Sequence, residues 1–246
     1  MTITSPHNEQ LKEVRKLAGR KWRDKLRLFV AEGEDLVKAA ARAGWEPEAL
    51  YVADGAGLDG IPVAPHVLAG VSQLGSGTRA LGVYGQRWAP APLGPVCVAL
   101  WGVNDPGNVG TVLRSALAFG AGSVALGPGS ADPYGPKAVR ASMGALFGVP
   151  VARVREPAEL PGRRIALVAG EGRPLDDLGS GLASGHGDRM QDLTLVVGAE
   201  REGLPDDVVA ACDEVAHIPI RSESLNAGMA ATVALYEVDR RMARHA

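Results

Sequence analysis

Three segments of the chain carry side chains whose types and spacing could support chemistry on a bound ligand. The first runs from Asn104 to Ser115 and combines Asn108 with Arg114. It follows the apolar run 96–100, so it lies at the carboxyl end of an expected buried strand, where open α/β sheets bind ligands. We expect Asn108 to cap the helix that follows and Arg114 to reach the same site. Taken alone, this segment also fits a capped helix with a surface arginine.

The second segment, residues 195–204, is an apolar strand that ends at Gly198 and is followed by Glu200. A glycine allows a ligand to approach the backbone closely. Glu200 would then lie at the same edge of the sheet. Taken alone, this segment also fits a strand-to-helix turn with solvated charges.

The third segment, residues 224–237, follows the short apolar stretch 218–220. Ser224 and Asn226 place a hydroxyl and an amide just before a helix of small residues. The first backbone N–H groups of a helix are unpaired, and we expect them to be available to a ligand here. The alternative is an ordinary N-cap on a tightly packed helix.

Several common kinds of site are excluded by pattern. Gly107 and Gly110 do not fit the dinucleotide-binding fingerprint G-x-G-x-x-G, and no Gly-Lys-Ser/Thr follows to form a P-loop. A nicotinamide-dependent enzyme is therefore disfavoured. No cluster of Cys and His has metal-ligand spacing, so we expect no metal.

The elements that must position these segments follow from the alternation of apolar strands with helices after residue 95. This alternation predicts an α/β fold with a mostly parallel sheet covered by helices on both faces. The expected strands span 96–100, 123–126, 149–154, 165–168, 193–197 and 215–218, and the expected helices 109–119, 136–146, 206–211 and 226–243. The stretch 176–192 reads as a surface loop, and we expect His186 within it to be solvated.

Residues 1–88 form a separate small α/β unit in this reading, joined through the Pro-rich linker 89–95 to a domain spanning 96–246. A loose helical period covers 8–27, and further short strands and helices follow up to residue 84. Although the net charge of the 246-residue chain is only −2, residues 9–27 are locally basic and can contact phosphates. A solvated helix face is the alternative reading of this segment. The candidate RNA contacts are Lys12, Arg15, Lys16, Arg20, Lys21 and Arg23.

Composition places the chain among globular proteins, with 46 % hydrophobic and 22 % charged residues. No apolar run approaches the roughly 20 residues of a membrane span, and the N-terminus lacks a signal-peptide pattern. Cys97 and Cys212 lie in apolar contexts and read as free thiols rather than a disulfide. We therefore expect a cytoplasmic protein with no membrane partner.

The three segments, taken together and in this order, resemble the SpoU (TrmH) family of RNA 2′-O-ribose methyltransferases within the SPOUT superfamily. The resemblance rests on Asn-x-Gly…Arg, then Gly-x-Glu-x-x-Gly-Leu, then Ile-Pro-Ile…Ser-Leu-Asn, and covers roughly residues 96–243. The N-terminal Ile3-Thr4-Ser5-Pro6-His7-Asn8, the basic run and Phe29-Val30-Ala31-Glu32-Gly33 resemble the substrate-binding domain of many members, which is similar to a ribosomal-protein RNA-binding fold.

The resemblance implies a sheet that ends in a deep trefoil knot, a bound S-adenosylmethionine and a homodimer with active sites near the subunit interface. It implies methyl transfer to a ribose 2′-hydroxyl, with Arg114 orienting the hydroxyl and polar residues around it. The implied catalytic residues are Arg114, Asn108, Glu200, Ser224 and Asn226. The implied cofactor-binding residues are Ala169, Gly170, Gly198, Ile218, Ile220 and Leu225.

One departure from the family pattern stands out. The usual Ser-Leu-Asn-Val-Ser is replaced by Ser-Leu-Asn-Ala-Gly, so that Ala227 and Gly228 are smaller than in the pattern. The extra N-terminal domain favours ribosomal over transfer RNA as substrate, by analogy. The alternative function is a non-catalytic RNA-binding or ribosome-assembly factor that keeps the knotted domain for dimerisation.

Overall fold

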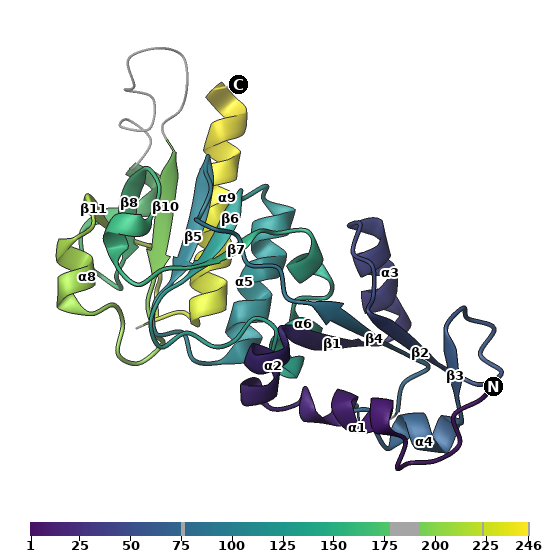
Figure 1. Ribbon diagram of the computed structural model, residues 1–246. Coiled ribbons are helices and arrows are strands. Elements are labelled where there is room, and N and C mark those ends of the chain that lie inside the picture. The colour runs from purple at the N-terminus through teal and green to yellow at the C-terminus, as the bar shows by residue number, and fades with distance from the viewer. Residues whose placement is uncertain (75–76, 178–191, 223, 246) are drawn as a thin grey trace. The chain divides into compact units, whose positions relative to one another are not determined.

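The computed structural model describes residues 1–74, 77–177, 192–222 and 224–245 (Figure 1). Residues 178–191, which hold most of the expected surface loop with His186, lie outside the described residues. The chain divides into two compact units. Unit 1 comprises Met1–Gln86 and Asp132–Phe147, and unit 2 comprises Arg87–Ala131 and Gly148–Ala246.

Unit 1 is built on a four-stranded sheet of order β1-β4-β2-β3. Its strands are β1 (Leu28–Glu32), β2 (Ala49–Ala53), β3 (Ile61–Val63) and β4 (Ala80–Gly85), and its first four helices are α1 (Glu9–Lys16), α2 (Arg20–Leu26), α3 (Glu34–Arg42) and α4 (Pro65–Ala69). β4 pairs antiparallel with both of its neighbours, whereas β2 and β3 are parallel. This mixed sheet supplies the support for the basic helices.

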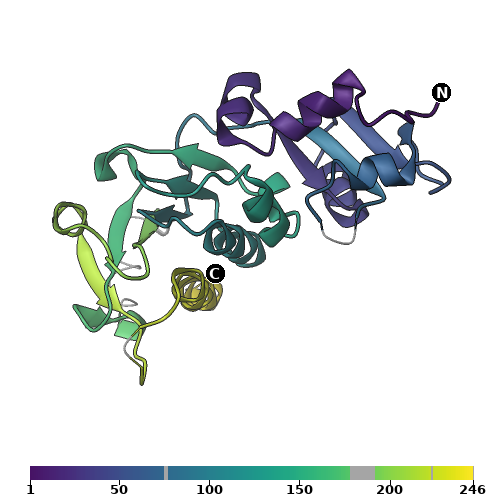
Figure 2. The ribbon, with the colours of Figure 1, turned by 90° about the horizontal axis from the view of Figure 1, so that it is seen from below.

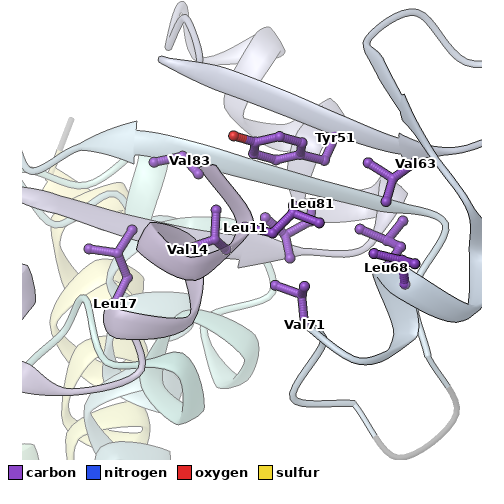
Figure 3. Close-up of a cluster of buried hydrophobic side chains, with 10 residues drawn as sticks. Leu11, Val14, Leu17, Tyr51, Val63, Leu68, Val71, Leu81 and Val83 are labelled. Carbon is purple, nitrogen blue, oxygen red and sulfur yellow. The ribbon is translucent and has the colours of Figure 1, made fainter. Parts of the chain in front are cut away.

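Two helices, rather than one continuous period, cover residues 9–26. α1 begins after Asn8, whose side-chain oxygen accepts from the backbone N–H of Leu11 at 3.3 Å, and the chain turns at Gly19 before α2 starts. Side chains of α1 and the turn after it pack against the sheet and α4 in a single apolar cluster (Figure 3). The cluster contains Leu11, Val14, Leu17, Tyr51, Val63, Val67, Leu68, Val71, Leu81 and Val83. Burial of this stripe leaves the polar face of α1 outward.

Unit 1 also includes a segment that the sequence assigned to the second domain. Residues 132–147 contain α6 (Pro136–Ala141) and a short 3₁₀ turn, Ala145–Phe147. Their aromatic rings join a cluster whose centre is Phe29, with ring centroids 4.8–6.0 Å apart: Phe29, Trp45, Tyr84, Tyr134 and Phe147. The predicted division at 89–95 missed this packing, because partners so distant in sequence leave no local signal.

A buried ion pair fixes the same segment to α2. The guanidinium of Arg23 donates to Asp132 Oδ2 from Nε at 2.9 Å and from Nη2 at 2.8 Å, and both side chains are at most 7 % exposed. Arg23 Nη1 also donates to the carbonyls of Leu17 and Ala18. All three nitrogens of this guanidinium thus donate hydrogen bonds within unit 1.

Unit 2 contains a seven-stranded sheet of order β7-β6-β5-β10-β8-β11-β9, in which all the described pairs are parallel. The strands are β5 (Val96–Leu100), β6 (Ser123–Leu126), β7 (Val151–Arg153), β8 (Arg163–Leu167), β9 (Arg173–Pro174), β10 (Leu193–Val197) and β11 (Glu214–His217). The prediction of a mostly parallel α/β sheet is confirmed. β9 is an edge strand of two residues and was too short to be recognised.

Helices cover both faces of this sheet. α5 (Pro106–Ala118) and α9 (Ala227–His245) lie side by side, as Figure 2 shows almost end-on, and contact β5, β6 and β10. The opposite face packs under α8 (Asp206–Ala210), where Cys97, Ala99 and Val196 meet Leu204 and Val208. Alternation of side chains along each strand separates the two layers.

Two helix boundaries and the expected linker differ from the predictions for local physical reasons. α5 begins at Pro106 rather than near residue 109, because Asp105 caps it. α6 ends at Ala141 rather than 146, because Met143 and Gly144 adopt positive φ angles of 49° and 91°. The expected linker 89–95 is fastened to unit 2, since the backbone of Leu93 exchanges hydrogen bonds with the hydroxyl of Ser123.

We predict that Asp132→Ala destabilises unit 1 by about 3–5 kcal/mol, because it leaves the buried charge of Arg23 without its partner. Native-state hydrogen exchange of the β1 and β4 amides measures this change. Replacing both partners with apolar residues, Arg23→Met with Asp132→Leu, should recover most of the loss. Glu9→Ala, which removes an exposed pair with Lys12, serves as the control and should leave exchange unchanged. Equal protection in wild type and Asp132→Ala would contradict the prediction.

Candidate functional site

A pocket of about 140 Å³ opens at the carboxyl ends of three adjacent strands of unit 2. Its wall is formed by the residues that follow β8, β10 and β11, together with the turn that enters α9. Parallel strands deliver their following loops to one edge of the sheet, so segments distant in sequence meet there. The lining is mainly apolar, and Glu200, His217 and Ser224 supply the charged and polar side chains.

The predicted cofactor-binding residues gather at this edge. Five of them line the pocket: Ala169, Gly198, Ile218, Ile220 and Leu225. Gly170 lines an adjoining, more open hollow that shares Ala169, Ile218 and Ile220 with the first. The strand ends identified from the sequence therefore come together as a single surface.

Gly198 is required by the closeness of the backbone that faces it. A Cβ at this position would lie 2.3 Å from the carbonyl carbon of Gly203 and 2.5 Å from the backbone N of Leu204. Residues 199–203 form a tight loop in which Ala199 and Gly203 exchange backbone hydrogen bonds of 3.0 and 2.9 Å. The loop folds back onto β10 only because position 198 has no side chain.

Glu200, at the tip of that loop, connects three parts of the chain. Its Oε1 atom accepts hydrogen bonds from the side-chain amides of Asn108 on α5 and of Asn226 before α9, the latter at 2.7 Å. A carboxylate only accepts, and each amide nitrogen only donates, so the three groups are complementary. Three of the five predicted catalytic residues are thus connected by hydrogen bonds, with Glu200 as the shared acceptor.

The helix caps are arranged differently from the prediction. Asp105, not Asn108, caps α5, with its Oδ1 accepting from the N–H of Gly107 at 2.6 Å. Asn226 caps α9, where its Oδ1 accepts from the N–H groups of Gly228 and Met229. These two N–H groups, expected to be available to a ligand, are therefore already satisfied.

The departure at Ala227-Gly228 has a packing explanation. A Cβ on Gly228 would lie 3.1 Å from both Cβ and Cγ2 of Thr111 on α5, which is tighter than ordinary contact. One turn further along, the hydroxyls of Ser115 and Thr232 are 2.6 Å apart. Small residues at the start of α9 thus let the two helices approach closely beside Asn226.

Arg114 and Ser224 are the predicted catalytic residues that this network does not include. Both side chains are exposed, and Ser224 lines the pocket. Arg114 lies on α5, lines neither hollow, and has no hydrogen-bond or ion-pair partner within the described ranges. Its guanidinium is therefore free to engage a group from outside its own unit.

The predicted RNA contacts lie on or beside α1 and α2 in unit 1, with one correction. Lys16, Arg20 and Lys21 are exposed, and Lys12 and Arg15 are half-buried. Arg23, by contrast, is 4 % exposed and forms a buried ion pair with Asp132. We therefore no longer expect Arg23 to bind RNA.

His217 is a pocket residue that sequence reasoning missed. It ends β11, lines both hollows, and its Nδ1 is 3.1 Å from the backbone carbonyl of Glu171. If Nδ1 carries the proton, as donation to a carbonyl requires, Nε2 is left as an acceptor. Its position in the expected strand 215–218, directly before Ile218, was the available signal.

The described residues also bear on metal sites, membrane spans and reactive thiols. No group of three or more His, Cys, Asp or Glu that could hold a metal occurs among them. Nor does any helix there have the length and apolarity needed to cross a bilayer. Both cysteines are free thiols. Burial raises the pKa of both, that of Cys212 to about 11, so neither is a ready thiolate nucleophile near neutral pH.

Comparison with known families agrees with this geometry. The model of the SpoU rRNA Methylase family matches residues 95–236, which include the whole network of Asn108, Glu200 and Asn226. The chain belongs to this family. Residues 8–74 match a second model, that of the MRM3-like substrate binding domain.

Individual relatives extend the comparison. The chain is 26 % identical over 251 residues to the 23S rRNA (guanosine(2553)-2'-O)-methyltransferase RlmP of Bacillus subtilis, covering 96 % of this chain and 98 % of that protein. It is 38 % identical over 150 residues to the 23S rRNA (uridine(2479)-2'-O)-methyltransferase of Streptomyces viridochromogenes, covering 56 % of this chain and 50 % of the relative. This chain thus spans about half the length of the latter relative in that match.

A solved structure resembles the whole chain. The AdoMet-bound rRNA methyltransferase of Sinorhizobium meliloti superposes with a TM-score of 0.84 at 28 % identity, covering 98 % of each chain. Both the parallel sheet and the N-terminal sheet are therefore features of a known SpoU architecture.

We predict that Gly198→Ala disrupts the pocket, because the added methyl group meets backbone atoms that cannot rotate away. Overpacking of this kind costs about 1–3 kcal/mol and displaces the loop that carries Glu200. Thermal unfolding and equilibrium binding of S-adenosylmethionine measure the two effects. Gly85→Ala, where an added Cβ meets nothing within 4 Å, is the matched control. Unchanged ligand affinity in Gly198→Ala would contradict this account of the pocket.

Proposed function

We propose that this protein transfers a methyl group from S-adenosylmethionine to the 2′-hydroxyl of a ribose in ribosomal RNA. The observation that carries the proposal is the Glu200 network at the mouth of an apolar pocket, in a chain of the SpoU family. The named activities of the Bacillus and Streptomyces relatives are ribosomal RNA 2′-O-methylations.

The residues present fit the cofactor. Apolar strand ends such as Ile218 and Leu225 suit the faces of an adenine, and backbone groups near Gly198 can read its edge. When bound, S-adenosylmethionine supplies a methyl group already activated by its sulfonium. The remaining task for the protein is to hold the ribose hydroxyl in line with that methyl group.

In this mechanism Arg114 orients the ribose oxygen and a neighbouring phosphate. A guanidinium keeps its proton in proteins and so cannot readily accept another, which makes positioning and charge stabilisation the physically stronger roles. Glu200, held by Asn108 and Asn226, fixes the loop beside the pocket, and Ser224 offers a hydroxyl to the RNA. Alignment of two reactants supplies up to roughly 7–11 kcal/mol of a barrier in the best cases.

We expect Arg114→Ala to lower kcat by at least about 100-fold, the usual scale for loss of a positioned charged donor. S-adenosylmethionine binding should be retained, because Arg114 does not line the pocket. Transfer of a labelled methyl group to total RNA, followed by mapping of the modified ribose, provides the measurement. Arg155→Ala, an exposed arginine elsewhere in unit 2, is the control. Normal turnover in Arg114→Ala would remove Arg114 from the mechanism.

The same experiment distinguishes the alternative of a non-catalytic RNA-binding or assembly factor. A wild-type protein that binds RNA but neither binds S-adenosylmethionine at micromolar concentration nor labels RNA would favour that alternative. The proposal also includes three finer features, of which the first two come from the family resemblance and the third from the composition. These are a trefoil knot around the pocket, a ribosomal-protein-like fold for the N-terminal module, and a cytoplasmic location, for which the two free thiols are suited.

A homodimer is part of the proposal and has support in the surface of α5 and α9. Met229, Val233 and Tyr236 recur at helical spacing on α9 and are 59 %, 40 % and 52 % exposed, and Leu117 of α5 is 51 % exposed. A continuous exposed apolar stripe commonly marks an association surface. Pairing through this face would bring the unpartnered Arg114 towards a second subunit.

Val233→Glu should therefore convert a dimer to a monomer, because it places a charge within the apolar stripe. Analytical ultracentrifugation measures the change. Arg155→Glu, which also adds a negative charge to unit 2 but lies off α5 and α9, should stay dimeric. A wild-type protein that sediments as a monomer at micromolar concentration would contradict the dimer.

A further inference from the structure

α2 presents its residues in an unusual way, with an arginine inward and apolar side chains outward. Arg23 is buried in the ion pair with Asp132, whereas Leu26 is 37 % exposed and Trp22, one turn earlier, is only half-buried. A surface helix normally buries its aromatic residue and solvates its arginine. The fold of unit 1 thus holds an indole at the surface of its most basic segment.

Two lysine side chains lie over the Trp22 ring. The Nζ atoms of Lys16 and Lys25 lie over it at 5.0 and 5.2 Å from the ring centroid. Neither lysine has a carboxylate partner in the described structure, whereas Lys12 pairs with Glu9 and Arg20 with Asp24. In that part of the chain, the two cations nearest the indole are therefore not held in ion pairs with neighbouring acids.

The indole N–H of Trp22 has no acceptor among the described residues. That of the buried Trp45, by comparison, donates to the carbonyl of Phe147 at 2.9 Å. Trp22 also lies outside the apolar cluster beneath α1. Its ring is thus neither a structural donor nor part of that core.

We infer that Trp22 is a stacking platform for an unpaired base of the RNA, with Lys16 and Lys25 holding the phosphates on either side of that base. This inference rests on the proposed function and narrows its substrate to RNA with an unpaired nucleotide at this surface. Aromatic side chains beside a basic groove bind single-stranded segments in this way.

Stacking of a base on Trp22 is favoured over the contacts that the ring makes with the two lysines. An exposed cation–π contact is weaker than a base–aromatic stack, so a base displaces the ammonium groups from the ring. The displaced ammonium groups are compact charges on flexible stems and can follow the adjacent phosphates. A fully paired duplex keeps its bases stacked internally and offers only phosphates to the same surface.

The test compares a hairpin RNA with an unpaired loop against a blunt duplex of the same stem sequence, using the full-length protein. Trp22→Leu should weaken hairpin binding about 5- to 150-fold, equivalent to about 1–3 kcal/mol, and change duplex binding less than about twofold. Trp22→Phe should retain most of the affinity, because a phenyl ring still stacks. Trp88→Leu, which removes a tryptophan that lies under Arg153 in unit 2, is the matched control and should bind both RNAs normally.

Salt dependence separates the roles of the ring and the lysines. Lys16→Ala should reduce the slope of log Kd against log salt for the hairpin by about 0.7, one single-strand phosphate contact, whereas Trp22→Leu should leave the slope unchanged. In methyl transfer, Trp22→Leu should raise KM and leave kcat unaltered. Equal losses for hairpin and duplex, or no loss for the hairpin, would overturn the stacking role.

A spectroscopic measurement guards against misfolding of the leucine variant. Stacking of a base on Trp22 should quench part of the tryptophan fluorescence of the wild type, and that part should be missing in Trp22→Phe. A wild type that neither binds RNA nor methylates it would overturn the proposed function and this inference together. A wild type that methylates RNA, with an unchanged KM in Trp22→Leu, would overturn this inference alone.

Discussion

One carboxylate oxygen connects the polar side chains at the pocket edge of the unit 2 sheet. Glu200 Oε1 accepts from the amides of Asn108 and Asn226, which belong to helices at opposite ends of unit 2 in sequence. Asn226 meanwhile uses its own oxygen to cap α9. The start of α9 and the position of Glu200 are therefore set by the same amide group, and neither can move without the other.

The pocket depends on this arrangement through the loop that carries Glu200. That loop is closed by reciprocal backbone bonds between Ala199 and Gly203 and lies against β10 because residue 198 is a glycine. α9 in turn packs closely against α5, because Gly228 has no Cβ to meet Thr111 and the hydroxyls of Ser115 and Thr232 are 2.6 Å apart. The polar residues are thus mounted on a strand end and two packed helices, and rigid mounting is what alignment of a cofactor with a nucleophile demands.

The sequence predicted this edge well because its signals are local. The apolar run of β10 was identified at its true bounds, and the resemblance of the three segments to one family grouped positions 108, 200 and 226. The prediction that Asn108 caps α5 was wrong, because Asp105 lies three residues earlier and both residue types cap helices equally well. The burial of Arg23 was beyond reach for a different reason: its partner Asp132 lies 109 positions away. Residues 9–27 hold eight cations. Their spacing does not show which of them pairs with a carboxylate so far away in the sequence.

The membership of residues 132–147 in unit 1 has a consequence for modularity. The polypeptide passes between the units at three points, after Gln86, Ala131 and Phe147. The N-terminal module is consequently an interrupted domain whose last piece is inserted between β6 and β7 of the other unit. A chimera that exchanged residues 1–86 alone would inherit an aromatic core without two of its rings, Tyr134 and Phe147. Exchange of RNA specificity between relatives with this organisation therefore requires two coordinated grafts, and that coupling favours divergence of the module in place over its wholesale replacement.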